Sequence, residues 1–155
     1  MVSNEQINVN KRNGRGLEAL NIDKIHSMVG FATEGITGVS ASHVEMNSGI
    51  QFFDKISTED IQQILIKSAN DLISLENPNY QYVAARLLLF SLRKKLFHRL
   101  WEHPKFLNHI KVCIEKGMYD EEILDNYTEA EIDRMGMWID HERDYNFTYA
   151  GLRQV

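Results

Sequence analysis

Apolar and polar residues alternate over a short stretch near the start of the chain. Ile7-Asn-Val-Asn-Lys11 has the period of two that is typical of a half-buried strand. Asn13-Gly14 is a strong signal for a hairpin turn, because both residues accept positive φ. Leu17-Glu-Ala-Leu20 then supplies a return strand. The pattern therefore predicts a β-hairpin within residues 7–20.

From Ile22 onward the apolar residues recur at spacings of three and four, which predicts helices. The first is expected over residues 22–34, with Asn21 as its N-cap and Gly35 as its stop. The second is expected over residues 41–53. The residues expected on their inner faces are Ile22, Ile25, Met28, Val29 and Ala32 in the first helix, and Val44, Met46, Ile50 and Phe53 in the second.

Two further helices complete the predicted bundle. Ser57 or Thr58 can cap the third, whose inner face is expected to include Ile61, Ile64, Leu65, Ser68, Leu72 and Leu75. Asn77-Pro78 breaks the chain, and a long fourth helix follows over residues 79–100. Its Phe90 and Lys94 lie side by side, because they are separated by one helical turn.

The remaining residues predict shorter helices. Residues 106–117 form an apolar-periodic segment that ends at a glycine, and residues 128–131 have the Thr-x-x-Glu pattern of a capping box. A last helical segment is expected near the C-terminal end. The fold class predicted from the sequence is therefore mainly α (α+β).

Composition and charge narrow the function classes. The single cysteine, Cys113, excludes a disulfide framework and a cysteine-based zinc site. Residues 1–100 carry a net charge of +1 and residues 101–155 one of −6, which argues against a broad nucleic-acid surface but allows a local anion site. The N-terminus lacks the apolar core of a signal peptide, and the most apolar run is too short to span a membrane. We expect a cytoplasmic protein.

Cations flank the predicted hairpin turn, with Lys11 and Arg12 before it and Lys24 after it. Such an arrangement suits a polyphosphate, although a plain surface hairpin with solvated charges is the simpler interpretation. The six histidines lack the spacing of a zincin helix, and neither a P-loop nor a dinucleotide glycine pattern is present. Residue chemistry alone therefore predicts a mostly helical protein with a candidate anion site, and no metal site or catalytic machinery.

Four motifs occur in order along the first part of the chain: Val9-Asn-Lys-Arg-Asn-Gly14, Glu18-Ala-Leu-Asn-Ile-Asp-Lys-Ile-His26, Ala32-Thr-Glu-Gly35 and Pro78-Asn-Tyr-Gln-Tyr-Val-Ala-Ala-Arg-Leu87. Together they closely resemble the N-terminus of the large (alpha) subunit of class I aerobic ribonucleotide reductase. The resemblance implies a small β-hairpin packed on a four-helix ATP-cone at residues 1–95. It also implies a helical linker at residues 96–155 that leads toward a catalytic barrel missing from this chain.

The resemblance further implies an allosteric site for ATP or dATP, with Mg²⁺. Carried over by position, that site would use Val9, Lys11, Arg12, Glu18, Asn21, Lys24, Thr58, Phe90 and Lys94. Lys11, Arg12 and Lys94 would neutralise phosphates. Glu18 and Asn21 would contact the adenine or ribose, and Lys24 would bridge base and phosphate. The sequence departs from the family at Gln62, where a histidine is frequent, and at Phe31, where a tryptophan is frequent.

The implied role is control of ribonucleotide reduction to deoxyribonucleotides for DNA synthesis. The family's reaction needs three barrel cysteines, so this chain alone is expected to be non-catalytic and without a bound redox cofactor. The implied partners are the remainder of the large subunit and the small, radical-carrying beta subunit, with no nucleic acid and no membrane. The alternative is a nucleotide-independent module that docks on a separate catalytic fragment or on the small subunit. A cone-bearing repressor is disfavoured, because its four-cysteine zinc ribbon is absent.

Overall fold

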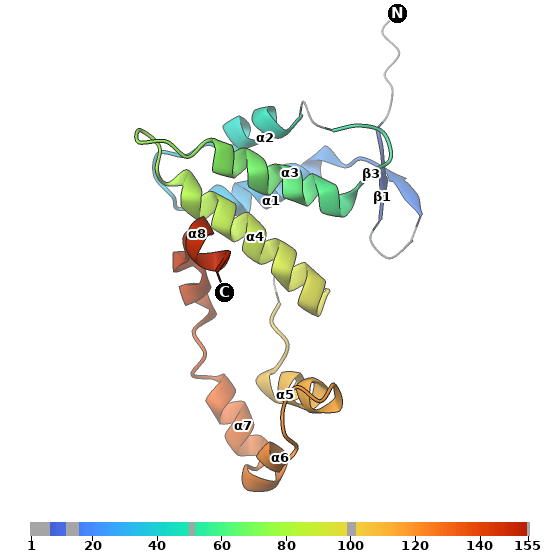
Figure 1. Ribbon diagram of the computed structural model, residues 1–155, viewed down its shortest axis with the longest axis vertical. Helices are drawn as coiled ribbons and strands as arrows, with labels where there is room; N and C mark the ends of the chain where they lie inside the picture. The colour runs from blue at the N-terminus through green and yellow to red at the C-terminus, as the bar shows by residue number, and fades with distance from the viewer. Residues whose placement is uncertain (1–6, 12–15, 50–51, 99–101, 155) are drawn as a thin grey trace, which may run out of the picture. The chain divides into compact units, whose positions relative to one another are not determined.

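The computed structural model describes residues 7–11, 16–49, 52–98 and 102–154 (Figure 1). The chain divides into two compact units, one made of residues 1–92 together with 144–155 and the other of residues 93–143. The predicted mainly α fold with a small β component is confirmed. None of the described helices has both the length and the apolarity needed to cross a membrane.

A three-stranded sheet lies at one end of the first unit (Figure 1). Strand β1 (Asn8–Asn10) is central; it pairs antiparallel with β2 (Leu17–Ala19) and parallel with β3 (Ile56–Ser57). The two hairpin strands are therefore as predicted, whereas Asn13-Gly14 lies outside the described residues. The sequence analysis did not predict β3, which has only two residues and so shows no periodicity.

Four helices lie between residues 22 and 97. They are α1 (Ile22–Thr33), α2 (Ala41–Gly49), α3 (Thr58–Asp71) and α4 (Tyr80–Phe97), whose last five residues belong to the second unit. Helix α2 packs against both α1 and α3. The fully buried core side chains include Val29, Val44, Leu65, Val83, Leu87 and Phe90. Burial of this apolar surface is the main force that holds the helices together.

Some predicted core positions are wrong. Helix α2 ends at Gly49, so Phe53 lies beyond it and is exposed. Met46 is exposed because the buried face of α2 passes through Val44 and Ser48, four residues apart, and Met46 lies between them on the opposite side. The exposed Ile22 is the first residue of α1, and the exposed Leu75 follows the end of α3.

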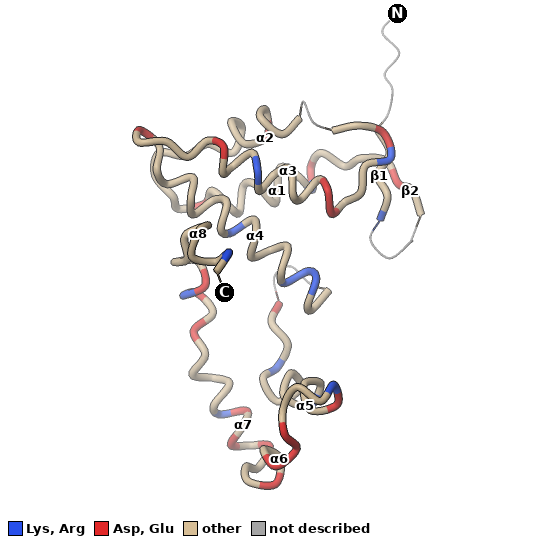
Figure 2. Tube along the Cα trace, viewed as in Figure 1, with Lys and Arg blue, Asp and Glu red and all other residues tan. Residues whose placement is uncertain are grey.

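The second unit is a small helical assembly. Helices α5 (Phe106–Glu115), α6 (Glu122–Asn126) and α7 (Glu129–Gly136) surround a core of Leu107, Ile110 and Ile132. The predicted capping box at the start of α7 is confirmed, since the side chains of Thr128 and Glu131 each bond the other's backbone N–H. Residues 120–133 hold seven acidic and no basic residues, which Figure 2 shows along α6 and α7.

The chain leaves the second unit through a 3-10 helix, η2 (His141–Asn146), and ends its described part in α8 (Tyr149–Leu152). Thr148 caps α8 by accepting a hydrogen bond from the Gly151 backbone N–H at 3.1 Å. From Asp144 onward these residues belong to the first unit, and Figure 1 shows α8 beside α4.

Candidate functional site

Strand β1 brings several of the predicted site residues to one place. Val9, 2 % exposed, lies opposite Glu18 of β2 and opposite Ile56 of β3. Asn10, the next residue, pairs with Ser57, which directly precedes Thr58 at the start of α3. The predicted residues Val9, Glu18 and Thr58 therefore gather around a single strand, with Lys11 at its end.

Two lysines share one carboxylate at this sheet. Glu18 Oε2 lies 2.6 Å from Lys11 Nζ, and Glu18 Oε1 lies 3.6 Å from Lys24 Nζ. The hydrogen bond from Lys11 is the main cause that lowers the pKa of Glu18, partial desolvation opposes it, and the charges of both lysines add to it. Two of the three cations that flank the predicted hairpin turn, Lys11 and Lys24, are thus held together by an acidic side chain.

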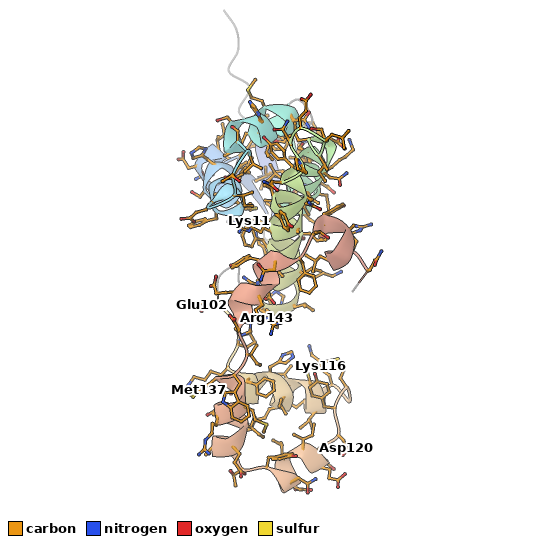
Figure 3. All side chains as sticks on the ribbon, turned by 90° about the vertical axis from the view of Figure 1, so that its left-hand side faces the viewer. Lys11, Glu102, Lys116, Asp120, Met137 and Arg143 are labelled. Carbon is orange, nitrogen blue, oxygen red and sulfur yellow. The ribbon has the colours of Figure 1, made fainter. Side chains whose placement is uncertain are left out.

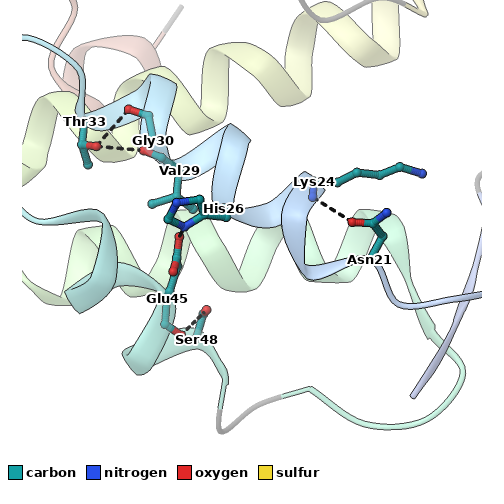
Figure 4. Close-up of polar contacts among 8 residues, drawn as sticks. All are labelled: Asn21, Lys24, His26, Val29, Gly30, Thr33, Glu45 and Ser48. Carbon is teal, nitrogen blue, oxygen red and sulfur yellow. Dashed lines mark hydrogen bonds and ion pairs between the residues drawn. The ribbon is translucent and has the colours of Figure 1, made fainter. Parts of the chain in front are cut away.

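Asn21 begins α1 and belongs to the same corner. Its Oδ1 accepts a hydrogen bond from the Lys24 backbone N–H at 3.1 Å, which confirms its predicted role as the N-cap (Figure 4). The cap uses the side-chain oxygen, so Nδ2 is the group with which Asn21 can donate to a ligand. Lys24 lies in the first turn, where the helix dipole disfavours a cation and a nearby anion offsets that cost.

At the start of α3, Ser57 is the cap, and not Thr58. Ser57 Oγ accepts from the Asp60 backbone N–H at 2.9 Å and donates to Asp60 Oδ2 at 2.7 Å. Thr58 is the first helical residue and is half-buried. Glu59 and Asp60 place two carboxylates in this first turn, which opposes an anion here. Charge compensation for a phosphate at this corner would therefore have to come mainly from Lys11 and Lys24.

The other predicted site residues are less closely connected to the sheet. Phe90 of α4 is only 1 % exposed, so its ring packs within the core. Lys94 follows one turn later, is half-buried, and belongs to the second unit. Arg12 lies outside the described residues. At the two departures from the family pattern, Gln62 is buried in α3 and Phe31 is exposed on α1.

The sequence analysis did not identify residues 54–57, which precede α3 and are bonded to β1. Asn8 donates its backbone N–H to Asp54 Oδ1 at 3.0 Å, and this bond lowers the pKa of Asp54. Lys55 donates its backbone N–H to Asn8 O at 2.8 Å and accepts from Asn10 Nδ2 at 2.8 Å. Lys55 has a φ of 65°, which non-glycine residues seldom adopt. A third lysine thus borders β1, and its only sequence signal was an Asp-Lys pair after Phe52-Phe53.

A pocket of about 650 Å³ lies in the second unit. Its lining includes Phe97, His103, His109, Tyr119 and Met137, the last of which Figure 3 labels. None of the predicted nucleotide-binding residues lines it. The candidate site is therefore defined by the charges around β1 and α1, and it is distinct from this pocket.

Comparison with known proteins agrees with the resemblance. The family model for the ATP cone domain matches residues 7–95. The chain is 47 % identical over 152 residues to the ribonucleoside-diphosphate reductase 1 subunit alpha of Salmonella typhimurium, and 46 % identical to that of Escherichia coli K12. Each match covers 98 % of this chain. The chain is also 41 % identical over 149 residues, or 96 % of its length, to the ribonucleoside-diphosphate reductase subunit alpha of Enterobacteria phage T4. The chain spans about a fifth of the length of these relatives.

Proposed function

Because this chain belongs to the ATP-cone family, we propose that it binds ATP or dATP, together with Mg²⁺, as an allosteric effector. The family and the relatives support a nucleotide-binding regulatory segment of the reductase alpha-subunit type. The choice of nucleotide, the metal ion and the residues that bind them are the proposal.

The observation that carries the proposal is the arrangement of Lys11, Glu18 and Lys24. Two ammonium groups from different elements converge on one carboxylate at the edge of the sheet. An incoming triphosphate offers both lysines an anion of higher charge than Glu18, so it can take over these contacts. The released carboxylate would then be available to accept a hydrogen bond from the adenine or the ribose.

The remaining residues complete the proposed site around this pair of lysines. Val9 supplies an apolar wall from the sheet, Asn21 Nδ2 a donor, and Thr58 a hydroxyl at the start of α3. Arg12 and Lys94 would add positive charge for the phosphates, and Phe90 would support the apolar side. The site as proposed therefore joins the hairpin to α1, α3 and α4.

The proposed output of the site is control of a ribonucleoside-diphosphate reductase. ATP would favour the active enzyme and dATP would inhibit it. The partners would be the remainder of the large subunit and the small beta subunit. The chain's single cysteine, Cys113, is buried in α5, so the chain acts in this proposal as a control element for chemistry carried out elsewhere.

Calorimetric titration of the 155-residue chain tests the binding proposal. ATP and dATP would each be titrated with and without Mg²⁺, and inorganic tripolyphosphate would serve as a probe without a base. We expect saturable one-site binding of both nucleotides, and weaker binding of tripolyphosphate because it lacks the base and ribose contacts. The absence of saturable heat up to millimolar nucleotide would overturn the proposal.

A second candidate is a nucleotide-independent docking module. The ion pairs of Glu18 favour it, because the lysines are already compensated without a ligand. In that case the chain should associate with the separately produced remainder of the alpha subunit or with the beta subunit, with equal affinity in the presence and absence of ATP. An affinity that changes with ATP excludes this candidate.

A further inference from the structure

Arg86 of α4 closes the C-terminal end of α1. Its Nη1 donates to the carbonyl oxygen of Glu34 at 2.6 Å and lies 3.5 Å from the carbonyl oxygen of Ala32. Helix α1 ends at Thr33 and Glu34 is its C-cap, so these carbonyls belong to its last turn. A cation at this end also complements the helix dipole.

The same guanidinium group contacts a second segment. Arg86 Cζ lies 5.3 Å from the centroid of the Tyr145 ring, a distance typical of a cation–π interaction. Tyr145 belongs to η2, and residues 144–155 form part of the first unit. Figure 1 shows this segment beside α4. Arg86 therefore connects the end of α1 with the chain segment that returns from the second unit.

Helix α1 also begins at the candidate nucleotide site. Asn21 caps its first turn, and Lys24 in that turn is ion-paired with Glu18 of the sheet. The last turn is tied to the helix body, because Thr33 Oγ1 lies 3.0 Å from the carbonyl oxygens of both Val29 and Gly30 (Figure 4). The helix is about 18 Å long at 1.5 Å per residue. Its continuous backbone hydrogen bonds link the turn at the candidate site to the turn that Arg86 contacts.

We propose that Arg86 is a positioning residue that couples nucleotide binding to the docking of residues 144–155 on the cone. The nucleotide contacts Lys24 and Asn21 at the first turn of α1. Arg86 bonds the Glu34 carbonyl at the other end of α1 and also contacts the Tyr145 ring. The inference rests on the proposed nucleotide site and adds the residues through which nucleotide binding would change the docking of residues 144–155. A ligand that favours one position of α1 favours the docked segment, and docking in turn raises the affinity for that ligand.

A purely structural role for Arg86 makes a different prediction. If Arg86 only caps α1, loss of Arg86 lowers the stability of the first unit. In that case the response of residues 144–155 to ATP is the same whether or not Tyr145 keeps its ring. If Arg86 couples nucleotide binding to the docking of residues 144–155, the response of this segment to ATP depends on both the Tyr145 ring and the Arg86 guanidinium group.

Hydrogen exchange of the 155-residue chain, measured with and without saturating Mg·ATP, tests the coupling. We expect ATP to slow exchange in residues 144–155 about fivefold or more in the wild type. Tyr145→Phe should keep this response because it keeps the ring, whereas Tyr145→Leu and Arg86→Gln should lose it. Tyr149→Leu, at a second half-buried tyrosine of the same segment, is the matched control and should keep it.

Calorimetry on the same variants separates the two proposals. Tyr145→Leu should still bind ATP, with an affinity lower than the wild type by at most the coupling factor. ATP binding without any change in exchange at residues 144–155 would overturn the inference alone, as would an undiminished response in Tyr145→Leu. Failure of the wild type to bind ATP would overturn the proposed function and the coupling with it. Tyr145→Leu leaves the Arg86–Glu34 hydrogen bond in place, so the test holds even if Arg86→Gln does not fold.

Discussion

The carboxylate of Glu18 lies 2.6 Å from the ammonium group of Lys11, across the hairpin that begins the fold. The same carboxylate reaches Lys24 at the start of α1, so one acidic side chain links the sheet to the helix. An anionic ligand at this corner would have to displace Glu18 from both lysines. Nucleotide binding at the proposed site would therefore be an exchange of one anion for another, and its affinity would report only the difference between the two sets of contacts.

Replacement of Glu18 by glutamine should change how stability depends on pH. The pKa of Glu18 is lowered in the folded protein, mainly by its hydrogen bond with Lys11. A lowered pKa contributes stability above the unfolded value of 4.5, and this contribution is lost as the pH falls through the folded value. Thermal unfolding should be measured from about pH 3 to pH 7, because this range includes the loss. The acid-induced decrease in Tm should be smaller for Glu18→Gln than for the wild type. Identical decreases would show that the ion pair does not form.

Replacement of Lys11 by glutamine should weaken ATP binding by about 1–3 kcal/mol, because a charge-assisted contact to phosphate is lost. Lys67→Gln is a matched control, since Lys67 is also an exposed lysine paired with a carboxylate, Asp71, at 3.1 Å. Calorimetry should show unchanged ATP affinity for the control. Equal losses in the two variants would mean that only overall charge matters, which would contradict the assignment of Lys11 to the site.

Replacement of Lys94 by alanine should also weaken ATP binding, by about 1–3 kcal/mol if Lys94 contacts phosphate. Lys95 is the matched control, because it is the next residue of α4 and is exposed. Titration of both alanine variants with Mg·ATP separates a specific contact from a general charge effect. Unchanged affinity in Lys94→Ala would remove this residue from the proposed site.

Two glycines should respond in opposite directions to replacement by alanine. A Cβ at Gly136 would lie 2.6 Å from the Cβ of Phe106, too close for packed α5 and α7, so Gly136→Ala should destabilise the second unit by about 1–3 kcal/mol. Gly30 lies within α1, where an added Cβ meets nothing within 4 Å. Gly30→Ala should therefore stabilise the protein by about 0.5–1 kcal/mol. Urea unfolding monitored by circular dichroism measures both, and stabilisation by Gly136→Ala would contradict the close packing.

Local sequence signals predicted the parts of the fold that depend on local physics. The N-cap at Asn21 and the capping box at Thr128 each involve residues at most three positions apart, and both form in the structure. For α3 the signal left Ser57 and Thr58 as alternatives, and Ser57 is the cap. The hairpin strands were also predicted, because alternation and turn residues lie within one short stretch.

The features that the sequence could not indicate depend on distant contacts. Strand β3 is a strand only because Val9 pairs with Ile56, and two residues carry no periodic signal. The contact of Arg86 with Tyr145 joins segments far apart in the sequence, and no sequence motif indicates that they meet. In the candidate site, residue types indicated that Lys11 and Lys24 suit phosphate. They did not indicate that Glu18 already bridges them, because that depends on the register of β1 against β2.

The parallel pairing of β1 with β3 has a consequence for the order of folding. The hairpin can form from neighbouring residues, but the bond from Asn8 to Asp54 spans 46 positions, and α1 and α2 lie in the loop that it closes. Such non-local pairings form late, because the loop they close costs entropy before any contact repays it. The start of α3 reaches the hairpin by this pairing, so a partly folded cone contains the lysine pair without Thr58. Affinity for the proposed effector should thus appear late in folding, and only a chain in which β1, β3 and α3 have come together would respond to it.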